Sequence, residues 1–169
     1  MIDGTLETID GRPALRFERR LAHSVERVWR AVSEPAELER WFPAAAEWSP
    51  AAGETFEAAG MTGEVTEVAA PHRLAWTFND ERYSFDLAAH EGGCLLVFIH
   101  VFDNRTLAAQ TAAGWETYFS RLEPHLAGGF LSEEEAHAPW AEVHESYAER
   151  FGVDPRPGRR FIATQRAGH

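Results

Sequence analysis

The side chain best placed for chemistry is His100, which lies inside the most apolar run of the chain, Cys94 to Phe102. A buried imidazole must find a hydrogen-bond partner or lose its charge. Two interpretations stay open. His100 is either a polar group inside a cavity, able to hydrogen-bond a ligand or to act as a general acid or base, or a histidine tied to a neighbouring strand or lying on the outer face of a sheet.

The spacing of the other reactive side chains indicates neither a catalytic centre nor a metal site. Cys94 has no basic residue beside it to lower the pKa of its thiol, so we expect a small core residue. His137 and His144 lie seven residues apart on an expected helix, and we interpret them as solvated. The zinc-protease helix motif fails because Ala148 stands four residues after His144. No catalytic residue, metal or cofactor is assigned, and a binding protein is favoured over an enzyme.

Composition excludes several further classes of function. All 16 basic residues are arginine, so lysine Schiff-base chemistry and a Walker-type phosphate lysine are excluded. The formal net charge of −11 argues against binding to nucleic acid. The N-terminus has no apolar core of a secretion signal, and no apolar stretch approaches the ~18 residues of a membrane span. We therefore expect a cytoplasmic protein with no membrane partner.

Hydrophobic spacing predicts one α+β fold. Alternating residues predict strands, and apolar residues three or four apart predict helices. Since the expected strands come in hairpins, we predict a curved antiparallel sheet of about six strands wrapped around a long C-terminal helix. Two short helices follow the first strand. The expected strands are 14–23, 53–58, 61–69, 73–78, 83–87 and 94–102, and the expected helices are 25–33, 36–41, 106–126 and 133–151.

The same spacing divides the chain into four parts. We expect a flexible N-terminal arm, a ligand-binding-type domain, a C-terminal helical extension of that domain, and a basic tail. Their respective residues are 1–13, 14–130, 131–153 and 154–169.

A longer motif resembles a known family. Residues Val28 to Phe42 read VWRAVSEPAELERWF. This resembles the V-W-x-A-[LV]-[ST]-x-P-x-x-L-x-x-W-F opening of the activator of heat-shock-protein-90 ATPase homologue family, in the SRPBCC (START-like, Bet v 1-like) superfamily. Similar pieces follow at Gly63-Glu64-Val65 with Pro71-His72-Arg73-Leu74, at Phe98-Ile99-His100-Val101-Phe102 and at Gly114-Trp115. The resemblance covers about Leu15 to Ala127. It implies a helix-grip fold with a cavity between the long helix and the sheet.

Aromatic residues spaced along one face of a helix or strand ordinarily belong to the core. Because the resemblance implies a cavity, the aromatic residues expected to face inward here become candidates for its lining. The polar candidates in the same volume also include Arg121 and His125, and we expect Arg121 to be solvated. The full set of predicted cavity-lining residues is Trp41, Phe42, Trp76, Phe78, Tyr83, Phe85, His100, Thr111, Trp115, Tyr118 and Phe119.

Three functions are compatible with these residues. The resemblance implies a small-molecule binding protein for an apolar or aromatic ligand, present as a monomer or homodimer. An alternative is a polyketide aromatase/cyclase-like or hydrolytic enzyme in which His100, Tyr83 or Tyr118 supplies acid–base chemistry. A second alternative is a co-chaperone-like interaction module, although chaperone activation is not expected because the docking domain of the eukaryotic activators has no counterpart here.

Overall fold

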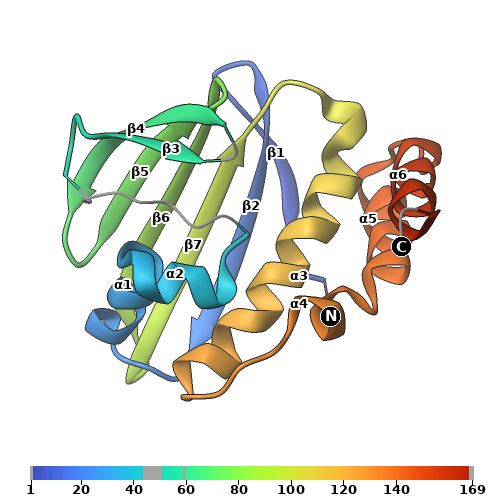
Figure 1. Ribbon diagram of the computed structural model, residues 1–169. Helices are drawn as coiled ribbons and strands as arrows, with labels where there is room; N and C mark the ends of the chain where they lie inside the picture. The colour runs from blue at the N-terminus through green and yellow to red at the C-terminus, as the bar shows by residue number, and fades with distance from the viewer. Residues whose placement is uncertain (1, 44–50, 59, 168–169) are drawn as a thin grey trace.

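One antiparallel sheet curves around a long helix, and the remaining helices lie on the same side of the sheet (Figure 1). The computed structural model describes residues 2–43, 51–58 and 60–167. The described strands form one sheet of seven, in the order β1-β2-β7-β6-β5-β4-β3. They are β1 (Thr5–Ile9), β2 (Arg12–Leu21), β3 (Thr55–Ala58), β4 (Met61–Ala69), β5 (Arg73–Phe78), β6 (Glu81–His90) and β7 (Gly93–Val101).

The long helix α3 crosses the concave face of the sheet, as predicted. A short 3-10 turn leads into it, and Gly128, with φ of +86°, follows its end. The helices are α1 (Val25–Ser33), α2 (Pro35–Trp41), α3 (Ala108–Leu126), α4 (Glu133–His137), α5 (Trp140–Phe151) and α6 (Arg156–Ala167). The expected helix-grip topology is therefore confirmed, with one strand more than the estimate.

The extra strand comes from the segment that sequence analysis treats as a flexible arm, residues 1–13. Thr5–Ile9 pairs with β2, so that Leu6 lies opposite Leu15. The turn is Asp10-Gly11, with φ of +51° and +76°. Asp-Gly is a strong two-residue hairpin signal because both residues must adopt positive φ. The interpretation as a loose arm is thus wrong for the described residues.

The interpretation of residues 154–169 as a tail is also corrected, since Arg156–Ala167 form α6; residues 168 and 169 lie outside the described part. This helix packs on α5. Phe161 contacts Trp140 with ring centroids 5.7 Å apart, and Gly158 lies so close to His144 that an added Cβ would be 1.9 Å from its Nε2. His144 is buried rather than solvated as expected.

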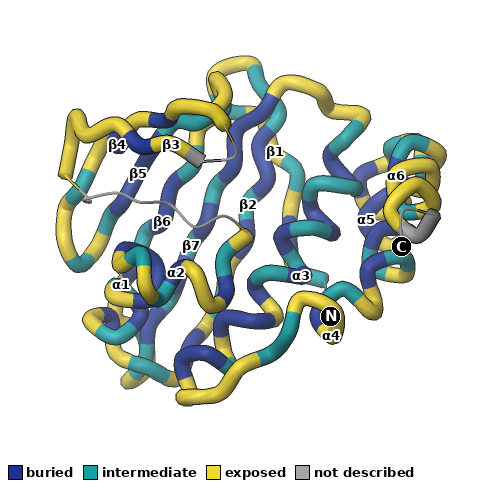
Figure 2. Tube along the Cα trace, viewed as in Figure 1, coloured by how far each residue is buried: buried dark blue, intermediate teal, exposed yellow. Residues whose placement is uncertain are grey.

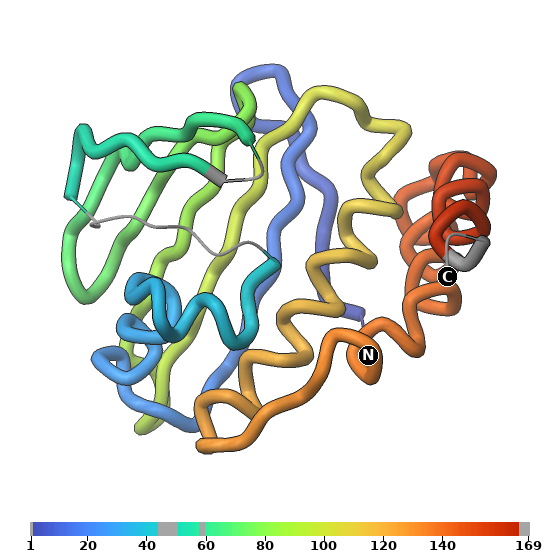
Figure 3. Tube along the Cα trace, viewed as in Figure 1, coloured from blue at the N-terminus to red at the C-terminus, as the bar shows by residue number. Residues whose placement is uncertain are grey.

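The predicted helix over 133–151 is divided into α4 and α5. Pro139 stands at the break, as the residue before α5. Proline has no N–H to donate to the carbonyl four residues earlier, so the helical hydrogen bonds are interrupted here. The following helix then lies along the side of α3 that faces away from the sheet (Figures 1 and 3).

Local signals place α1 and α2 as predicted. The Ser24 side chain accepts a hydrogen bond from the Arg27 N–H and caps α1. Pro35 is the first residue of α2 and has no N–H to offer the Ala31 carbonyl at the end of α1. The buried Trp41 indole N–H donates to that carbonyl instead, at 2.8 Å.

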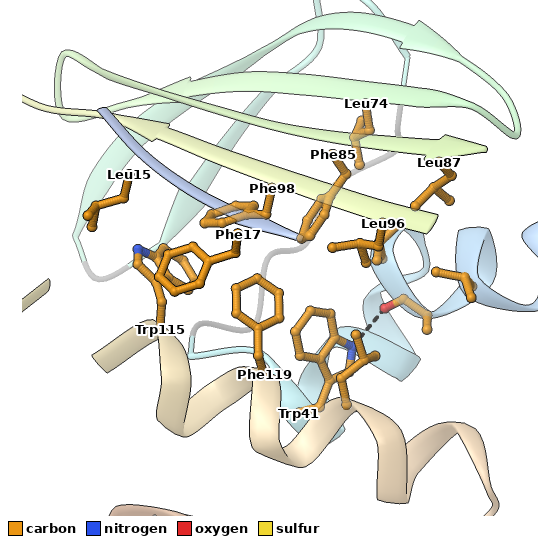
Figure 4. Close-up of a cluster of buried hydrophobic side chains, with 14 of the residues drawn as sticks. Leu15, Phe17, Trp41, Leu74, Phe85, Leu87, Leu96, Phe98, Trp115 and Phe119 are labelled. Carbon is orange, nitrogen blue, oxygen red and sulfur yellow. Dashed lines mark hydrogen bonds between the residues drawn. The ribbon is translucent and has the colours of Figure 1, made fainter. Parts of the chain in front are cut away.

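The core lies between α3 and the concave face (Figures 2 and 4). Phe17, Phe98 and Phe119 are almost fully buried there, and the Phe98 ring lies 5.3 Å from that of Phe119. On the convex face, Val97 and Ile99 of β7 are only half-buried. Although the sequence of this strand is apolar throughout, only its concave face is covered by helices, since none of the described helices lies behind the sheet (Figure 1).

Among the described residues, no helix combines the length and the apolar character that crossing a bilayer requires.

Candidate functional site

Three rings lie side by side across the middle of the concave face. We call Trp76, Tyr83 and His100 the ring row. Trp76 of β5 is opposite Tyr83 of β6, and Tyr83 is opposite His100 of β7. The rings of Trp76 and Tyr83 stack with centroids 5.3 Å apart, and those of Tyr83 and His100 stack at 4.3 Å. Trp115 of α3 meets Tyr83 edge-on, at 6.2 Å. Sequence analysis predicted all four residues, and the sheet register brings them together.

His100 points inward and both of its ring nitrogens have partners. The Trp115 indole N–H donates to Nδ1 at 3.0 Å. Because an indole nitrogen can only donate, Nδ1 carries no proton and Nε2 must carry one. Nε2 donates it to the Glu81 carboxylate, at 2.5 Å. The imidazole is therefore neutral in this arrangement, and neither of its nitrogens is free to bind a ligand unless one of these hydrogen bonds is broken.

Glu81 is not among the site residues predicted from the sequence. It follows the Asn79-Asp80 hairpin turn and is in phase with Tyr83 and Phe85, and this period of two places it on the concave face. Within β5, β6 and β7, all of whose residues are described, it is the one carboxylate on that face.

Near the β5–β6 turn, the Glu81 carboxylate and the Tyr83 hydroxyl are polar groups on the concave face of β6. The Tyr83 hydroxyl has no hydrogen-bond partner in the described part of the chain. Burial, followed by the charge of Glu81, raises the pKa of Tyr83 above its ordinary value. The phenol is thus protonated at neutral pH and can donate a hydrogen bond.

Half-buried residues gather at one end of the concave face, near the β5–β6 turn. We call this group the open end; its members are Phe42, Phe78, Glu81, Tyr83 and Thr111. At the other end of the same strands the inward side chains are buried. Phe78 stacks on Phe56 of β3, with centroids 6.0 Å apart. Thr111 lies one turn before Trp115 on α3, on the same stripe.

Rings fill much of the described interior between the open end and the core. Phe42, directly after α2, lies between the helix and the sheet, with its ring centroid 5.6 Å from Trp115 and 6.2 Å from Trp76. Trp41, Phe85 and Phe119 are buried. Trp41 lies 6.0 Å from Phe119 and 6.3 Å from Phe85, so these predicted lining residues are core contacts in this structure.

Two predictions for α3 are wrong. Tyr118 does not face the sheet; its ring packs edge-on against His137 of α4, at 5.9 Å. Arg121 is buried rather than solvated, and its Nε donates to the Leu131 carbonyl at 2.8 Å. Both residues lie on the side of α3 that the helical extension covers. The sequence offered no signal that the helical extension covers this side of α3.

A shallow groove of about 420 Å³ lies on the opposite, convex face of the sheet. Its floor includes small side chains of β5 and β6, Ala75 and Ser84, and its sides include Arg73 and Arg82. Both arginines are engaged by carboxylates, Arg73 by Glu67 and Asp86 and Arg82 by Asp10. Trp76 and Tyr83 also belong to the lining of this groove, although their rings stack on the concave face.

Reactive residues outside the ring row do not form a second site within the described residues. Burial raises the pKa of the Cys94 thiol, which suits a small core residue. No three His, Cys, Asp or Glu side chains there could jointly hold a metal ion.

A partly buried ion-pair cluster holds α2 against α1 and α3. The Glu37 carboxylate accepts from Arg27 at 2.5 Å and from His125 at 2.9 Å. Burial acts to raise the pKa of Glu37, but the hydrogen bonds from Arg27 and His125 outweigh it, so the pKa is lowered. A carboxyl group with a lowered folded-state pKa stabilises the protein above its unfolded-state pKa, and this stability is lost as pH falls through the folded-state pKa.

We therefore predict that Glu37→Gln lowers the free energy of unfolding by about 2 kcal/mol at pH 7, the contribution typical of a charged hydrogen bond. The difference from the wild type should shrink as pH falls below about 4 and the wild-type carboxylate is protonated. Urea denaturation at a series of pH values measures both. Glu39→Gln, an exposed position on the same helix, is the control and should change little. An equal deficit at pH 7 and pH 3 would contradict the assignment.

A second buried network links distant segments of the chain. Glu116 of α3 accepts a hydrogen bond from the Tyr147 hydroxyl of α5 and pairs with Arg19 of β2 at 2.7 Å. Tyr147 is fully buried, and its hydroxyl accepts the Gly4 N–H at 2.9 Å. Burial, then the hydrogen bond to Glu116, raises the pKa of Tyr147. This network is structural and lies on the far side of α3 from the open end.

Comparison with solved structures shows the same fold in several proteins. CalU16 from Micromonospora echinospora has 22% identity and a TM-score of 0.73, over 88% of this chain and 97% of that one. EF2215 from Enterococcus faecalis has 22% identity and a TM-score of 0.72, over 88% and 90%. DynU16, of the dynemicin biosynthetic locus, has 22% identity and a TM-score of 0.61, over 69% and 48%. No curated protein matches the chain.

A curved sheet that grips a long helix defines the helix-grip fold, which this chain shares with these structures. The chain belongs to the family of activator of Hsp90 ATPase homolog 1-like proteins, whose model matches residues 22–127. The resemblance drawn from the VWRAVSEPAELERWF motif is confirmed.

Proposed function

We propose that the protein is a cytoplasmic small-molecule binding protein and that residues 14–130 hold an apolar or aromatic ligand between α3 and the sheet, at the open end. The observation that carries the proposal is the Tyr83 hydroxyl. It is half-buried among rings, protonated at neutral pH, and has no partner in the described part of the chain. No buried polar side-chain atom of the described residues lacks a partner, so this unpaired hydroxyl is accessible and available to donate a hydrogen bond to a ligand acceptor.

The surroundings of Tyr83 support an aromatic or apolar ligand. Trp76 and Trp115 lie on two sides of it, and Phe42 and Phe78 are half-buried beside these rings. Ligand sites are commonly lined by such residues with a few polar groups that fix orientation. A ligand entering from this end would contact Phe42 first along α2, and we infer that it displaces this ring from between Trp76 and Trp115.

Thermal unfolding against fatty acids, sterols, flavonoids and aromatic polyketides tests the proposal. A ligand at 100 times its dissociation constant adds about 2.7 kcal/mol of stability, which raises the melting temperature by roughly 5–10 °C for a domain of this size. Quenching of tryptophan fluorescence should accompany the shift, because Trp76 and Trp115 line the site.

Tyr83→Phe is expected to weaken binding of the ligand so identified about fivefold, since it removes one hydrogen bond of about 1 kcal/mol and keeps the ring. Tyr118→Phe is the matched control, because that ring packs against α4 outside the site, and it should leave affinity unchanged. Equal effects of the two substitutions would place the ligand elsewhere. If no compound shifts the melting temperature, the binding proposal fails and an interaction module becomes the better hypothesis.

A further inference from the structure

The open end carries one negative charge on the ligand side of the sheet. Trp115 fixes the His100 ring in its neutral form, with the proton on Nε2. The group that accepts this proton's hydrogen bond, Glu81, is therefore the charged member of the pair. A neutral imidazole next to a carboxylate leaves a net charge of about −1, with no compensating cation inside the pair.

No arginine neutralises this charge within the described part of the chain. The nearest basic residue in sequence, Arg82, lies on the convex face and pairs with Asp10 at 2.9 Å. Arg12 reaches the same hairpin, but it donates to Asp103 and to the Asp80 carbonyl. Among the described residues, His100 is the sole hydrogen-bonding partner of Glu81. The carboxylate is 26% exposed, so its side chain remains accessible to a further donor.

Aromatic rings surround the approach to this carboxylate. Phe78 lies opposite Glu81 in the register of β5 and β6, and Tyr83 lies on the same face two residues along. The negative faces of such rings attract cations. A half-buried carboxylate in apolar surroundings is also costly, and a cation that pairs with it offsets this cost. Rings and carboxylate together favour a positively charged group.

Resting on the function proposed above, we propose that the open end selects ligands in which a protonated amine is joined to an apolar or aromatic body. The amine pairs with the Glu81 carboxylate, and the body lies against the rings of Trp76, Tyr83 and Trp115. The net charge of −11 on the whole chain favours the approach of cations to any part of its surface. This attraction is not selective. Selectivity for the open end comes from Glu81, the one carboxylate on the concave face of β5, β6 and β7.

Matched ligand series test the charge preference directly. Phenethylamine, tryptamine and naphthylethylamine are titrated by calorimetry at pH 7, each beside the corresponding alcohol and the corresponding carboxylate. Within each series the body is the same and the charge differs. We expect each amine to bind about tenfold more tightly than its alcohol, and each carboxylate to bind more weakly than the alcohol.

Glu81→Gln tests whether the Glu81 carboxylate is the group that binds the amine. The glutamine side-chain oxygen can still accept from His100 Nε2, so the bond between Trp115 and His100 is retained while the charge is removed. In this variant we expect the amine and its alcohol to bind with about equal affinity, and the affinity for the alcohol to stay as in the wild type. Glu142→Gln, an exposed position on α5, removes the same charge from the chain and should leave the preference intact.

The outcomes separate this proposal from the function on which it rests. An amine preference that persists in Glu81→Gln, or one that disappears equally in Glu142→Gln, overturns the role of Glu81. Alcohols that bind as tightly as amines to the wild type overturn the charge preference and leave the binding function standing. If none of the series binds while a neutral or acidic compound of the wider panel does, only the charge preference fails. If nothing binds in either experiment, both fail.

Discussion

Trp41→Ala is expected to lower the free energy of unfolding by about 4 kcal/mol, within the range for removing a large aromatic residue from a core. Trp41 is fully buried and touches both Phe85 and Phe119. Its loss also leaves the Ala31 carbonyl without the N–H that Pro35 cannot supply. Urea denaturation gives the energy directly, and the melting temperature should fall by about 10 °C.

Two further variants separate the contributions of the ring and the hydrogen bond. Trp41→Phe keeps most of the aromatic volume and removes the indole N–H, so it should cost less than Trp41→Ala. Trp29→Ala removes a tryptophan that is only half-buried on α1 and should also cost less. If Trp29→Ala destabilised the protein as much as Trp41→Ala, the central place of Trp41 in the core would be wrong.

Glu116→Ala is the other substitution with a large expected effect, a loss of about 3 kcal/mol in the free energy of unfolding. Glu116 is one of two carboxylates that pair with the partly buried Arg19, so its removal leaves Arg19 with Asp3 alone. Here Arg19 would lose the carboxylate at 2.7 Å, and the buried Tyr147 hydroxyl would lose its acceptor. Denaturation by urea at pH 7 measures the loss.

Glu123→Ala provides the control for this substitution. It lies on the same helix, is exposed, and removes the same charge. It should change the free energy of unfolding by less than about 0.5 kcal/mol, as most surface substitutions do. A comparable loss for both variants would show that helix propensity or net charge, rather than the network, accounts for the effect of Glu116→Ala.

Most of the fold could be predicted because its signals are local. The Ser24 cap, Pro35 and the alternation in β4 to β7 each act within a few residues, and they placed the corresponding elements within a few positions. The Asp10-Gly11 turn was a local signal too, and treating it as part of a loose arm lost a strand. The packing of α6 on α5 could not be predicted, because it depends on contacts between Gly158 and His144 that no local pattern reveals.

The ring row was predictable because a period of two places residues on one face of a sheet. Trp76 and Tyr83 were assigned inward on this basis, His100 was a candidate for which an outward position also stayed open, and the same rule would have found Glu81. The orientation of α3 was less predictable, because both of its sides are covered. Tyr118 was placed toward the sheet because nothing in the sequence showed that α4 lies against that side.

The network around Glu116 joins residues made at very different times during synthesis. Gly4 and Tyr147 are separated by 143 positions and are in direct hydrogen-bonding contact, and Arg150 donates to the Gly4 carbonyl as well. A ribosome delivers β1 and β2 early and α5 more than a hundred residues later. Until α5 emerges, Glu116 and Arg19 have only each other and Asp3. The segment that precedes β1 therefore acquires its hydrogen bonds to α5 only after more than a hundred further residues have been made.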